Sequence, residues 1–436
     1  MYYLIGIKGS GMAPLATILH DLGYAVSGSD IDSYIFTEDA LHERNIPVYS
    51  FDKKNIKDGY TVIIGNAFLE DQEEVQAARQ SAQVTCYRYP EFLGHFMENY
   101  TSIAITGTHG KTTTTGMAYH MYKDFFKTSV LIGDGTGHAR KDSTHFIAEC
   151  CEYQDHFLAY YPTYAIISNI ELDHVDYFKT LDQYIASFET FAKQVKKMVI
   201  AWGDDKNIRK LNIKNKVFYY GLQSSNDLWA TNITEDDTGM TFDVYIHGSM
   251  FGHFSLPYFG RHMLYNALSI IALGYIENID IKHIMSSLQS FKGTKRRYSI
   301  QEIGHNIFVD DYAHHPTAIE YVIKATQTRY PDKKIIAIFK PDRYSRAERF
   351  ATGFASALSL ADTVYYCDFP KNATKDGSTI TIEDMAHLTS NAMILPENEE
   401  GANILAKHEG VVFLFMSSKD IYKLEEKVIK LKKKTI

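Results

Sequence analysis

The N-terminal third of the chain alternates short apolar segments with segments of helical periodicity. Residues 2–7 form an apolar run, and residues 12–22 carry apolar side chains at helical spacing. The same order returns in the apolar residues 61–65 and the helical pattern of residues 72–81. Strands separated by helices of about ten residues indicate parallel βαβ units. The sequence therefore predicts an α/β fold built on parallel sheets.

The pattern restarts twice along the chain. At ~100–200 residues per domain, 436 residues allow two to four domains. A helix ends near residue 98 and the apolar strand SIAIT follows, while the glycine and basic cluster GTKRR begins at residue 293. We therefore predict a Rossmann-like N-terminal domain over residues 1–98, a central domain over 99–293 and an α/β C-terminal domain over 294–436. Within the central domain, residues 218–259 read as an antiparallel addition to the sheet.

Composition and the chain start narrow the functional classes. The formal charge of −8 argues against a nucleic-acid coat. Four cysteines without a CxxC pattern fit a reducing compartment rather than a disulfide framework. The first residues lack the features of a signal peptide, and no apolar run reaches the ~18 residues that a membrane span needs. We expect a cytoplasmic protein that binds no nucleic acid and does not insert into membranes, as a monomer or a dimer.

The first glycine-rich segment, GIKGSG at residues 6–11, lies between a strand and a helix, and we call it the N-terminal glycine loop. Glycines at a helix N-terminus let backbone N–H groups approach phosphates. The spacing GxxGxG is not the dinucleotide GxGxxG, which disfavours a nicotinamide cofactor. Asp30, after the second strand, is placed to accept from a ribose hydroxyl. A tight turn that binds nothing remains the alternative for this loop.

The second glycine-rich segment, residues 106–113 with the sequence TGTHGKTT, is called the GKT loop below. The strict P-loop would have glycine at position 105, where the chain has Ile105, so this is a shorter variant. The shorter loop is still expected to bind a nucleotide in the same way. Its backbone N–H groups surround the phosphates, Lys111 reaches the β/γ oxygens, and Thr112 offers a hydroxyl to Mg²⁺. We predict that the ATP phosphates are bound by Gly107, Thr108, His109, Gly110, Lys111, Thr112 and Thr113.

A Mg²⁺–nucleotide site needs further ligands at the ends of neighbouring strands. Glu149 ends the apolar strand HFIAE, with Glu152 three residues on, and His174 lies in ELDH after the strand YAIIS. Because the carboxyl ends of parallel strands share one crevice, these groups are expected to converge. Singly, each is more often a surface carboxylate or a loop histidine. We predict a metal site made by Thr112, Glu149 and His174.

The last third carries a polar cluster, DDYAHHP at residues 310–316, together with arginines at strand ends. Paired histidines and aspartates suggest either a transition-metal site or a polar pocket. A zinc site usually needs four well-placed ligands, and no cysteine is nearby in the sequence, so we prefer a substrate pocket. Arg297, Arg343 and Arg346 offer forked donors to a phosphate or a carboxylate.

Taken in order, these motifs resemble those of the Mur ligases. The resemblance runs nearly the full length and rests on GIKGSGM at 6–12, GTHGKTTTT at 107–115, AECCEY at 148–153, NIELDHVDYF at 169–178, GRHMLYNAL at 260–268, GTKRRY at 293–298, DDYAHHP at 310–316 and RYSR at 343–346. It implies three domains, for a UDP-sugar, for ATP, and for an amino acid with part of ATP. It implies ATP and Mg²⁺ as cofactors and a ligase that joins L-alanine to the lactyl carboxylate of UDP-N-acetylmuramate through an acyl phosphate.

The resemblance also implies roles for single residues. Catalytic roles fall on Lys111, Glu149, His174, Arg297, Asp311 and His314. Asn266 and Arg297 match the nucleotide side, and the UDP-sugar is expected at Gly9, Ser10, Gly11, Met12 and Asp30. The amino-acid pocket is expected at Tyr312, His314, Arg343 and Arg346.

The chain departs from the family pattern mostly near this pocket. Met263 stands where the family often has asparagine, Ser417, Ser418 and Lys419 replace a glycine-rich turn, and Lys340 and Asp342 replace glutamine and histidine. Sister ligases carry a carbamylated lysine at the position of Glu189, so no carbamate is expected here. The alternatives are a sister ligase that takes another amino acid or a recycled peptide, and a nucleotide-binding sensor without turnover.

Overall fold

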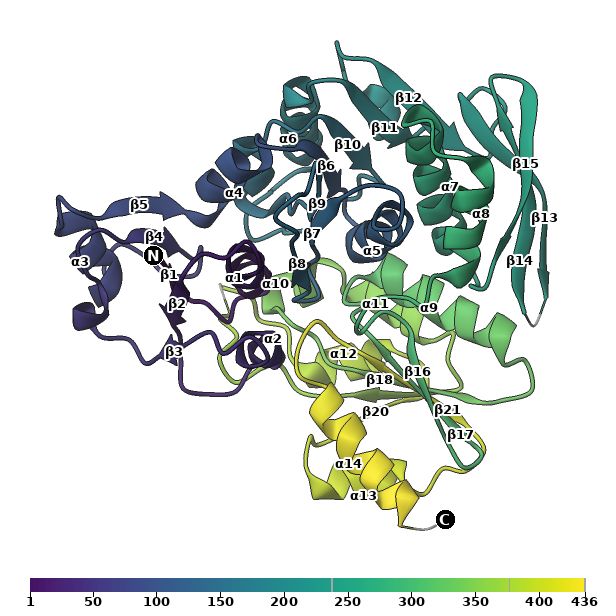
Figure 1. Cartoon of the computed structure of the whole chain (residues 1–436). Coiled ribbons are helices and arrows are strands. Elements are labelled where there is room, and N and C mark those ends of the chain that lie inside the picture. The colour runs from purple at the N-terminus through teal and green to yellow at the C-terminus, as the bar shows by residue number, and fades with distance from the viewer. Residues whose placement is uncertain (237, 376, 435–436) are drawn as a thin grey trace.

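The computed structural model describes residues 1–236, 238–375 and 377–434, and these residues form three β-sheets with helices on their faces (Figure 1). The prediction of an α/β fold with parallel sheets is confirmed. No sheet of the described residues takes strands from both sides of residue 98 or of residue 293, and we keep these positions as the proposed domain boundaries. Residues 435–436, the end of the predicted third domain, lie outside the described residues.

The first sheet is parallel throughout and has the strand order β3-β2-β1-β4-β5. This is a Rossmann-like order, which places a ligand crevice at the carboxyl ends of the central strands. Its elements are β1 (Tyr2–Ile5), α1 (Met12–Asp21), β2 (Val26–Ser29), η1 (Phe36–Glu38), α2 (Asp39–His42), β3 (Val48–Tyr49), η2 (Lys53–Asn55), β4 (Thr61–Ile64), α3 (Glu73–Gln80), β5 (Thr85–Arg88) and α4 (Tyr89–Met97). The N-terminal glycine loop joins β1 to α1, at the mouth of that crevice.

The second sheet has the order β15-β14-β13-β12-β11-β10-β6-β9-β7-β8. It is parallel from β13 to β7, and β14 and β15 add an antiparallel meander. The antiparallel addition predicted for residues 218–259 is therefore confirmed from β13 onward, whereas β12 pairs in parallel with both of its neighbours. Its elements are β6 (Thr101–Thr106), α5 (Lys111–Tyr122), β7 (Thr128–Leu131), β8 (Gly137–His138), β9 (His145–Glu149), η3 (Tyr153–Ala159), β10 (Tyr164–Ile167), α6 (Leu181–Gln194), β11 (Met198–Trp202), η4 (Ile208–Lys210), β12 (Val217–Gly221), β13 (Leu228–Asp236), β14 (Gly239–Ile246), β15 (Ser249–Leu256), α7 (Arg261–Ile276) and α8 (Ile281–Ser290).

The two faces of the second sheet are covered differently. Helices α5, α7 and α8 pack on one face around buried side chains such as Met117 and Ile270 (Figure 1). On the other face, α4 and α6 share a core with α1, so that Leu15 of the first sheet's unit and Phe188 of α6 belong to one buried cluster. Because this apolar core is continuous, burial holds the N-terminal unit against the central sheet.

The third sheet has the order β16-β17-β21-β18-β19-β20 and is parallel except for β16. Helices α9, α11 and α12 share a buried cluster with one face, and α13 and α14 pack on the other. Its elements are β16 (Ser299–Ile303), β17 (Asn306–Asp311), α9 (Pro316–Arg329), β18 (Ile335–Phe339), α10 (Tyr344–Arg349), α11 (Ala351–Leu358), β19 (Thr363–Tyr366), α12 (Ile382–Leu388), β20 (Ala392–Ile394), α13 (Glu399–Leu405), β21 (Val412–Met416) and α14 (Tyr422–Lys433).

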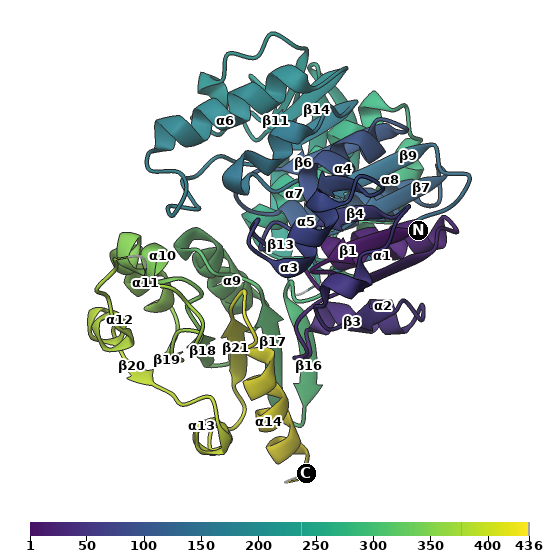
Figure 2. The ribbon, with the colours of Figure 1, turned by 90° about the vertical axis from the view of Figure 1, so that its left-hand side faces the viewer.

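The elements from β16 onward gather on one side of the molecule, below the second sheet and beside the first (Figure 2). None of the helices within the described part of the chain combines the length and the apolar character that crossing a bilayer requires.

A buried carboxyl group on α14 makes the stability of the third domain depend on pH. Burial, reinforced by the Asp310 carboxylate, raises the pKa of Glu425 from about 4.5 to about 8. The folded chain therefore binds this proton more tightly than the unfolded chain, and the resulting stability is fully present below pH 4.5 and lost as the pH rises through 8. We expect the free energy of unfolding to fall by up to about 4 kcal/mol from this group between pH 5 and 9.

The variant Glu425→Gln is accordingly expected to raise the melting temperature at pH 9 and to leave it nearly unchanged at pH 5. Thermal unfolding at the two pH values measures the difference. Glu426→Gln is the matched control, because this neighbour on the same helix is exposed. A gain of equal size at both pH values would show that the titration of Glu425 is not its source.

Candidate functional site

The GKT loop connects β6 to α5 in a conformation that only glycine tolerates at two positions. Gly107 and Gly110 have φ angles of +126° and +83°, in the left-handed region. A Cβ atom would lie 2.2 Å from Ser168 Oγ at Gly107, and 2.7 Å from Asn266 Oδ1 at Gly110. The His109 N–H donates to Asn169 Oδ1 at 2.9 Å, which anchors the loop to the end of β10. The free N–H groups at the start of α5 thus face the carboxyl edge of the sheet.

Lys111, the first residue of α5, is tied to a buried carboxylate. Its Nζ donates to the Gly107 carbonyl at 2.5 Å and lies 3.0 Å from Glu152 Oε2. Burial works against the charged form of Lys111, but Glu152 outweighs it and keeps the pKa of the amine above its ordinary value. Burial likewise opposes ionisation of Glu152, yet Lys111 and His174 lower its pKa to about 2. The pair is therefore ionised, with the cation held at the loop.

The three residues predicted to form the metal site lie on one cavity but do not all touch. Thr112 Oγ1 donates to Glu149 Oε1 at 3.1 Å, and the Gly133 N–H donates to Glu149 Oε2 at 2.7 Å. His174 instead lies 3.5 Å from Glu152 Oε1, through its Nε2. All three predicted residues line a cavity of about 680 Å³.

The charge state of Glu149 shows what this corner of the cavity can hold. Burial raises the pKa of Glu149, although Arg297 and Lys111 act in the opposite direction. A buried carboxylate beside a threonine hydroxyl is an oxygen donor set of the kind Mg²⁺ takes, and a bound cation would offset the cost of burying the charge. The donor chemistry of Thr112 and Glu149 therefore fits Mg²⁺, with His174 across the same cavity.

The N-terminal glycine loop forms one end of this cavity, which Gly9, Ser10, Gly11, Met12 and Asp30 all line. Asp30 is buried, and its oxygens accept from the Lys8 N–H at 2.7 Å and from the Ile31 N–H at 2.8 Å. The carboxylate thus fixes the loop backbone, in addition to whatever lone pairs it offers a ligand.

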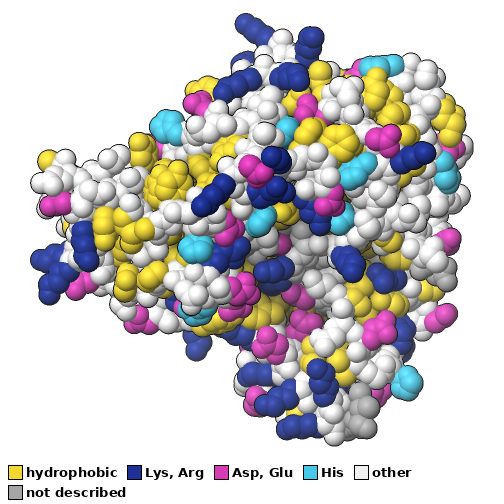
Figure 3. Space-filling model, in the orientation of Figure 1, with side chains coloured by type: hydrophobic (Ala, Val, Ile, Leu, Met, Phe, Trp, Pro, Cys, Tyr) yellow, Lys and Arg dark blue, Asp and Glu magenta, His cyan; other side chains and the backbone are white. Residues whose placement is uncertain are grey.

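The other end of the cavity belongs to the third domain. Tyr312, His314, Arg343 and Arg346 line it, as do the family departures Asp342, Ser418 and Lys419. The Nδ1–H of His314 donates to the Tyr312 carbonyl at 2.9 Å, which leaves Nε2 with the lone pair. Burial lowers the pKa of His314 to about 3, so the ring is neutral at neutral pH. Figure 3 shows basic, acidic and histidine side chains gathered in the middle of this face of the molecule.

Arg297 links the central and third domains at the GKT loop. Its Nη2 donates to Thr112 Oγ1 at 2.9 Å, and its guanidinium lies 4.6 Å from the centroid of the Tyr312 ring. Asp311 is buried nearby and accepts from the Tyr298 N–H at 2.8 Å; burial raises its pKa to about 6.

Two acidic residues of the segment 171–176, called the 171–176 loop here, bind arginines of the third domain. Asp173 Oδ1 lies 2.9 Å from Arg346, whose Nη1 also binds Asp342 at 2.7 Å. Asp176 Oδ2 accepts from Arg343 Nη1 at 2.5 Å. The Arg346 guanidinium was expected in the amino-acid pocket, and in this structure it is buried between two carboxylates. The loop that carries His174 is thereby fixed to the third domain.

Replacing Arg343 with alanine is expected to lower the free energy of unfolding by about 0.5–1 kcal/mol, since its pair with Asp176 is partly exposed. Thermal denaturation gives the value. Arg349→Ala on the same helix is the control, because Arg349 is exposed. An Arg343→Ala shift no larger than that of the control would mean that this ion pair does not stabilise the domain contact.

A second cavity of about 440 Å³ opens on the opposite side of the GKT loop. Asn266, predicted on the nucleotide side, lines it with Met263. The aromatic walls of this cavity were not predicted from the sequence. The ring centroids of Trp202 and Tyr265 lie 4.5 Å apart, and the rings of His262 and Tyr321 stack with their centroids 5.5 Å apart. Flat apolar walls with a few polar groups suit a planar base. The sequence held one signal for these walls, the aromatic residues that lie within or beside the motifs described above.

Comparisons with known proteins address the whole chain. Three family models match it: the Mur ligase family catalytic domain over residues 1–101, the Mur ligase middle domain over 105–274, and the Mur ligase glutamate ligase domain over 296–418.

Solved structures share the fold. The UDP-N-acetylmuramate-alanine ligase MurC from Thermotoga maritima aligns with a TM-score of 0.84 and 23% identity over 100% of this chain and 99% of that chain. A murein peptide ligase from Psychrobacter arcticus aligns at 0.74 and 21% identity, over 100% and 99%. The UDP-N-acetylmuramate:L-alanyl-gamma-D-glutamyl-meso-diaminopimelate ligase from Neisseria meningitides aligns at 0.60 and 26% identity, over 68% and 99%. The predicted resemblance is confirmed, and the chain belongs to the Mur ligase family.

Proposed function

We propose that this protein is an ATP-dependent ligase that joins L-alanine to the lactyl carboxylate of UDP-N-acetylmuramate. One observation carries the proposal: a single cavity runs from the N-terminal glycine loop past the GKT loop to the pocket of Tyr312 and His314. A nucleotide sugar, a transferring phosphoryl group and an amine need this order of sites. The reaction belongs to cytoplasmic peptidoglycan precursor synthesis, and through the cell wall to cell shape and division.

In the first step, a carboxylate oxygen of the sugar attacks the γ-phosphorus of ATP, and ADP leaves. Backbone N–H groups of the GKT loop hold the phosphates, and Lys111 and Arg297 neutralise charge on the transferring group. Thr112 and Glu149 would hold Mg²⁺, which would supply further charge neutralisation at the phosphate oxygens; His174, paired with Glu152 in this structure, would have to leave that partner and lose a proton to join them. Asn266 and the aromatic walls of the second cavity take the adenine side.

In the second step, the amine of the amino acid attacks the acyl carbon, and inorganic phosphate leaves. The amine loses a proton to solvent as the amide forms. The ring of His314, neutral and with its Nε2 lone pair free because Nδ1–H is bound to a backbone carbonyl, offers the incoming amine a hydrogen-bond acceptor. Tyr312, Arg343 and Arg346 surround the amino acid. Asp311 fixes the backbone that presents this group.

The acceptor is the open part of the proposal. Arg346 already binds Asp173 and Asp342, which leaves fewer donors for the carboxylate of a single amino acid. This favours, as a second candidate, a sister ligase that takes another amino acid or a recycled peptide. The match to peptide ligases of the same family is compatible with it.

Phosphate release from Mg·ATP, measured with UDP-N-acetylmuramate and a series of acceptors, tests both candidates. Release that needs both the sugar and L-alanine supports the main proposal. Glycine is expected to react 10- to 200-fold more slowly, because one methyl group supports only ~1–3 kcal/mol of discrimination. Release with a peptide alone moves the protein to the sister role, and none with any acceptor despite tight ATP binding indicates a sensor.

A further inference from the structure

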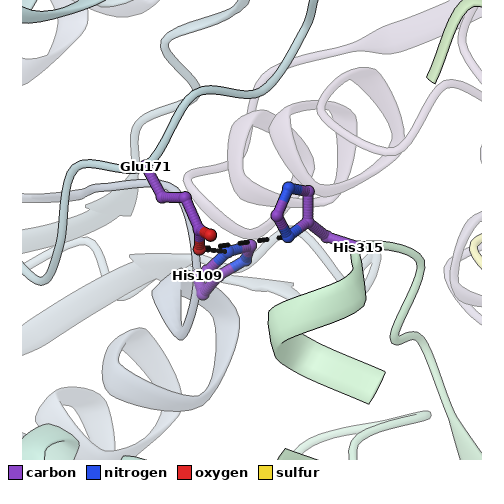
Figure 4. Close-up of side chains that lie close together, drawn as sticks. All are labelled: His109, Glu171 and His315. Atoms are coloured by element: carbon purple, nitrogen blue, oxygen red, sulfur yellow. Dashed lines mark hydrogen bonds and ion pairs between the residues drawn. The ribbon is translucent and has the colours of Figure 1, made fainter. Parts of the chain in front are cut away.

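Two histidines and a glutamate from three separate segments meet beside the GKT loop (Figure 4). His109 lies in that loop, Glu171 follows β10, and His315 caps the N-terminus of α9 in the third domain. His109 Nε2 lies 2.9 Å from Glu171 Oε2, and His315 Nδ1 lies 3.9 Å from the same oxygen. Their donor atoms all lie within 4.8 Å of one another.

We propose that His109, Glu171 and His315 form a binding site for a transition-metal dication of the zinc class. Two imidazoles and one carboxylate are a zinc donor set that leaves a fourth position for water. Tetrahedral ligands at zinc distances lie ~3.3–3.5 Å apart, so the two measured separations bracket the required value and each needs to change by about half an ångström. The site is distinct from Thr112, Glu149 and His174.

The protonation states suit a metal ligand set. Burial opposes the charged form of Glu171, but hydrogen bonding from His109 outweighs it and lowers its pKa to about 2. Burial lowers the pKa of His315 to about 4, so its ring is neutral at neutral pH. Coordination requires these two states, an ionised carboxylate and an imidazole with a free lone pair.

Neighbouring groups orient the metal-facing atoms, and a bound ion would displace the proton that His109 Nε2 now donates to Glu171 Oε2. Thr317 Oγ1 donates to Glu171 Oε1 at 2.7 Å, which orients the carboxylate and leaves Oε2 toward the histidines. His315 is only 2% exposed, and its Nδ1, the nitrogen measured 3.9 Å from Glu171, takes only a long contact of 3.4 Å from the Thr317 N–H that an ion could replace. Its other nitrogen, Nε2, has no hydrogen-bond partner in the described chain. His109 and Glu171 line the second cavity, which gives an ion a path to the site.

A metal at this place would join the GKT loop to the third domain. His109 and Glu171 belong to the central domain, whereas His315 belongs to the third domain, where it precedes helix α9. The bound ion would hold the two domains in the arrangement seen here. Metal binding is measured without turnover, so it can fail or succeed independently of the proposed ligase activity.

The test uses the full-length protein, stripped of metals with a chelator and kept in excess Mg²⁺ to saturate the oxygen-rich site. Co²⁺ is titrated while visible absorption is recorded, and Zn²⁺ binding is followed by calorimetry. We expect one equivalent to bind, with the intense Co²⁺ spectrum of a four-coordinate site containing nitrogen ligands. His315→Ala and Glu171→Gln are each expected to weaken binding by at least 10- to 100-fold.

Two further variants make the result specific. His387→Ala is the matched control, because His387 is exposed on α12 of the same domain. Cys151→Ser removes a ligand from a second cluster, Cys151, Glu152 and His174, that also has metal-ligand geometry. Absence of binding, or binding that survives both His315→Ala and Glu171→Gln, overturns the proposal, as does binding lost only in Cys151→Ser. Glu171→Gln preserves side-chain shape and so remains informative if His315→Ala does not fold.

Discussion

Replacing Lys111 with alanine is expected to lower turnover by on the order of 10³-fold or more, since it removes a cation from the transferring phosphoryl group. The amine is held at the start of α5 by the Gly107 carbonyl and by Glu152, so it is already positioned for phosphate. ATP-dependent phosphate release with the substrates of the proposed reaction measures the effect. Lys123→Ala, at the exposed end of the same helix, is the control.

This variant also disturbs a buried charge, which must be separated from the chemical effect. Glu152 is fully buried, and breaking a buried ion pair costs about 3–5 kcal/mol, an upper value here because His174 still faces the carboxylate. The double variant Lys111→Ala with Glu152→Gln removes both charges and is expected to regain most of the lost melting temperature. It should not regain turnover. Recovery of turnover in the double variant, or near-normal turnover of Lys111→Ala, would refute the role given to Lys111.

The fold was predictable wherever the signal was local. Apolar runs followed by glycine and helical periodicity define β1 and α1, and β6 and α5, because a βαβ unit imposes that order on neighbouring residues. Several strands were missed, among them β5, β7, β11 and β20. β20 carries too few apolar residues to stand out from a loop, and pairing with β19 alone makes it a strand.

The site was predictable at strand ends and unpredictable across domains. The end of β9 places Glu149 beside Thr112, as the parallel sheet requires. The next carboxylate, Glu152, reaches Lys111 from the irregular turn that follows β9, where Gln154 and Asp155 have left-handed φ angles of +52° and +59°. Nothing in the local pattern indicates that turn, so the ion pair could not be foreseen.

Contacts between distant segments could not be predicted either, because local sequence patterns do not show how the domains pack. Asp342 and Arg346 stand four residues apart across the N-terminus of α10, so their pairing is a local contact. The second partner of Arg346, Asp173, comes from another domain and depends on how the third sheet packs against the second. The aromatic walls of the second cavity likewise combine residues from β11, α7 and α9.

The substitution Glu149→Gln is expected to lower turnover without lowering the stability of the protein in the absence of Mg²⁺. Glu149→Gln keeps the shape of the side chain and an oxygen to accept from the Gly133 N–H. It removes the negative charge that a bound cation requires. Turnover is expected to fall by on the order of 10³-fold, with a higher Mg²⁺ concentration needed for half-maximal rate.

Stability without Mg²⁺ should not fall in this variant and is expected to rise above neutral pH. Burial raises the pKa of Glu149, so the wild-type folded state binds its proton more tightly and loses stability as the pH rises above the unfolded value near 4.5. Glutamine carries no such dependence. Paired melting curves at pH 5 and 8, with Glu73→Gln on the exposed surface of α3 as the control, measure the difference. Normal turnover of Glu149→Gln, or a loss of stability in this variant that grows with pH, would contradict the proposal that the Glu149 carboxylate binds the metal and does not stabilise the fold.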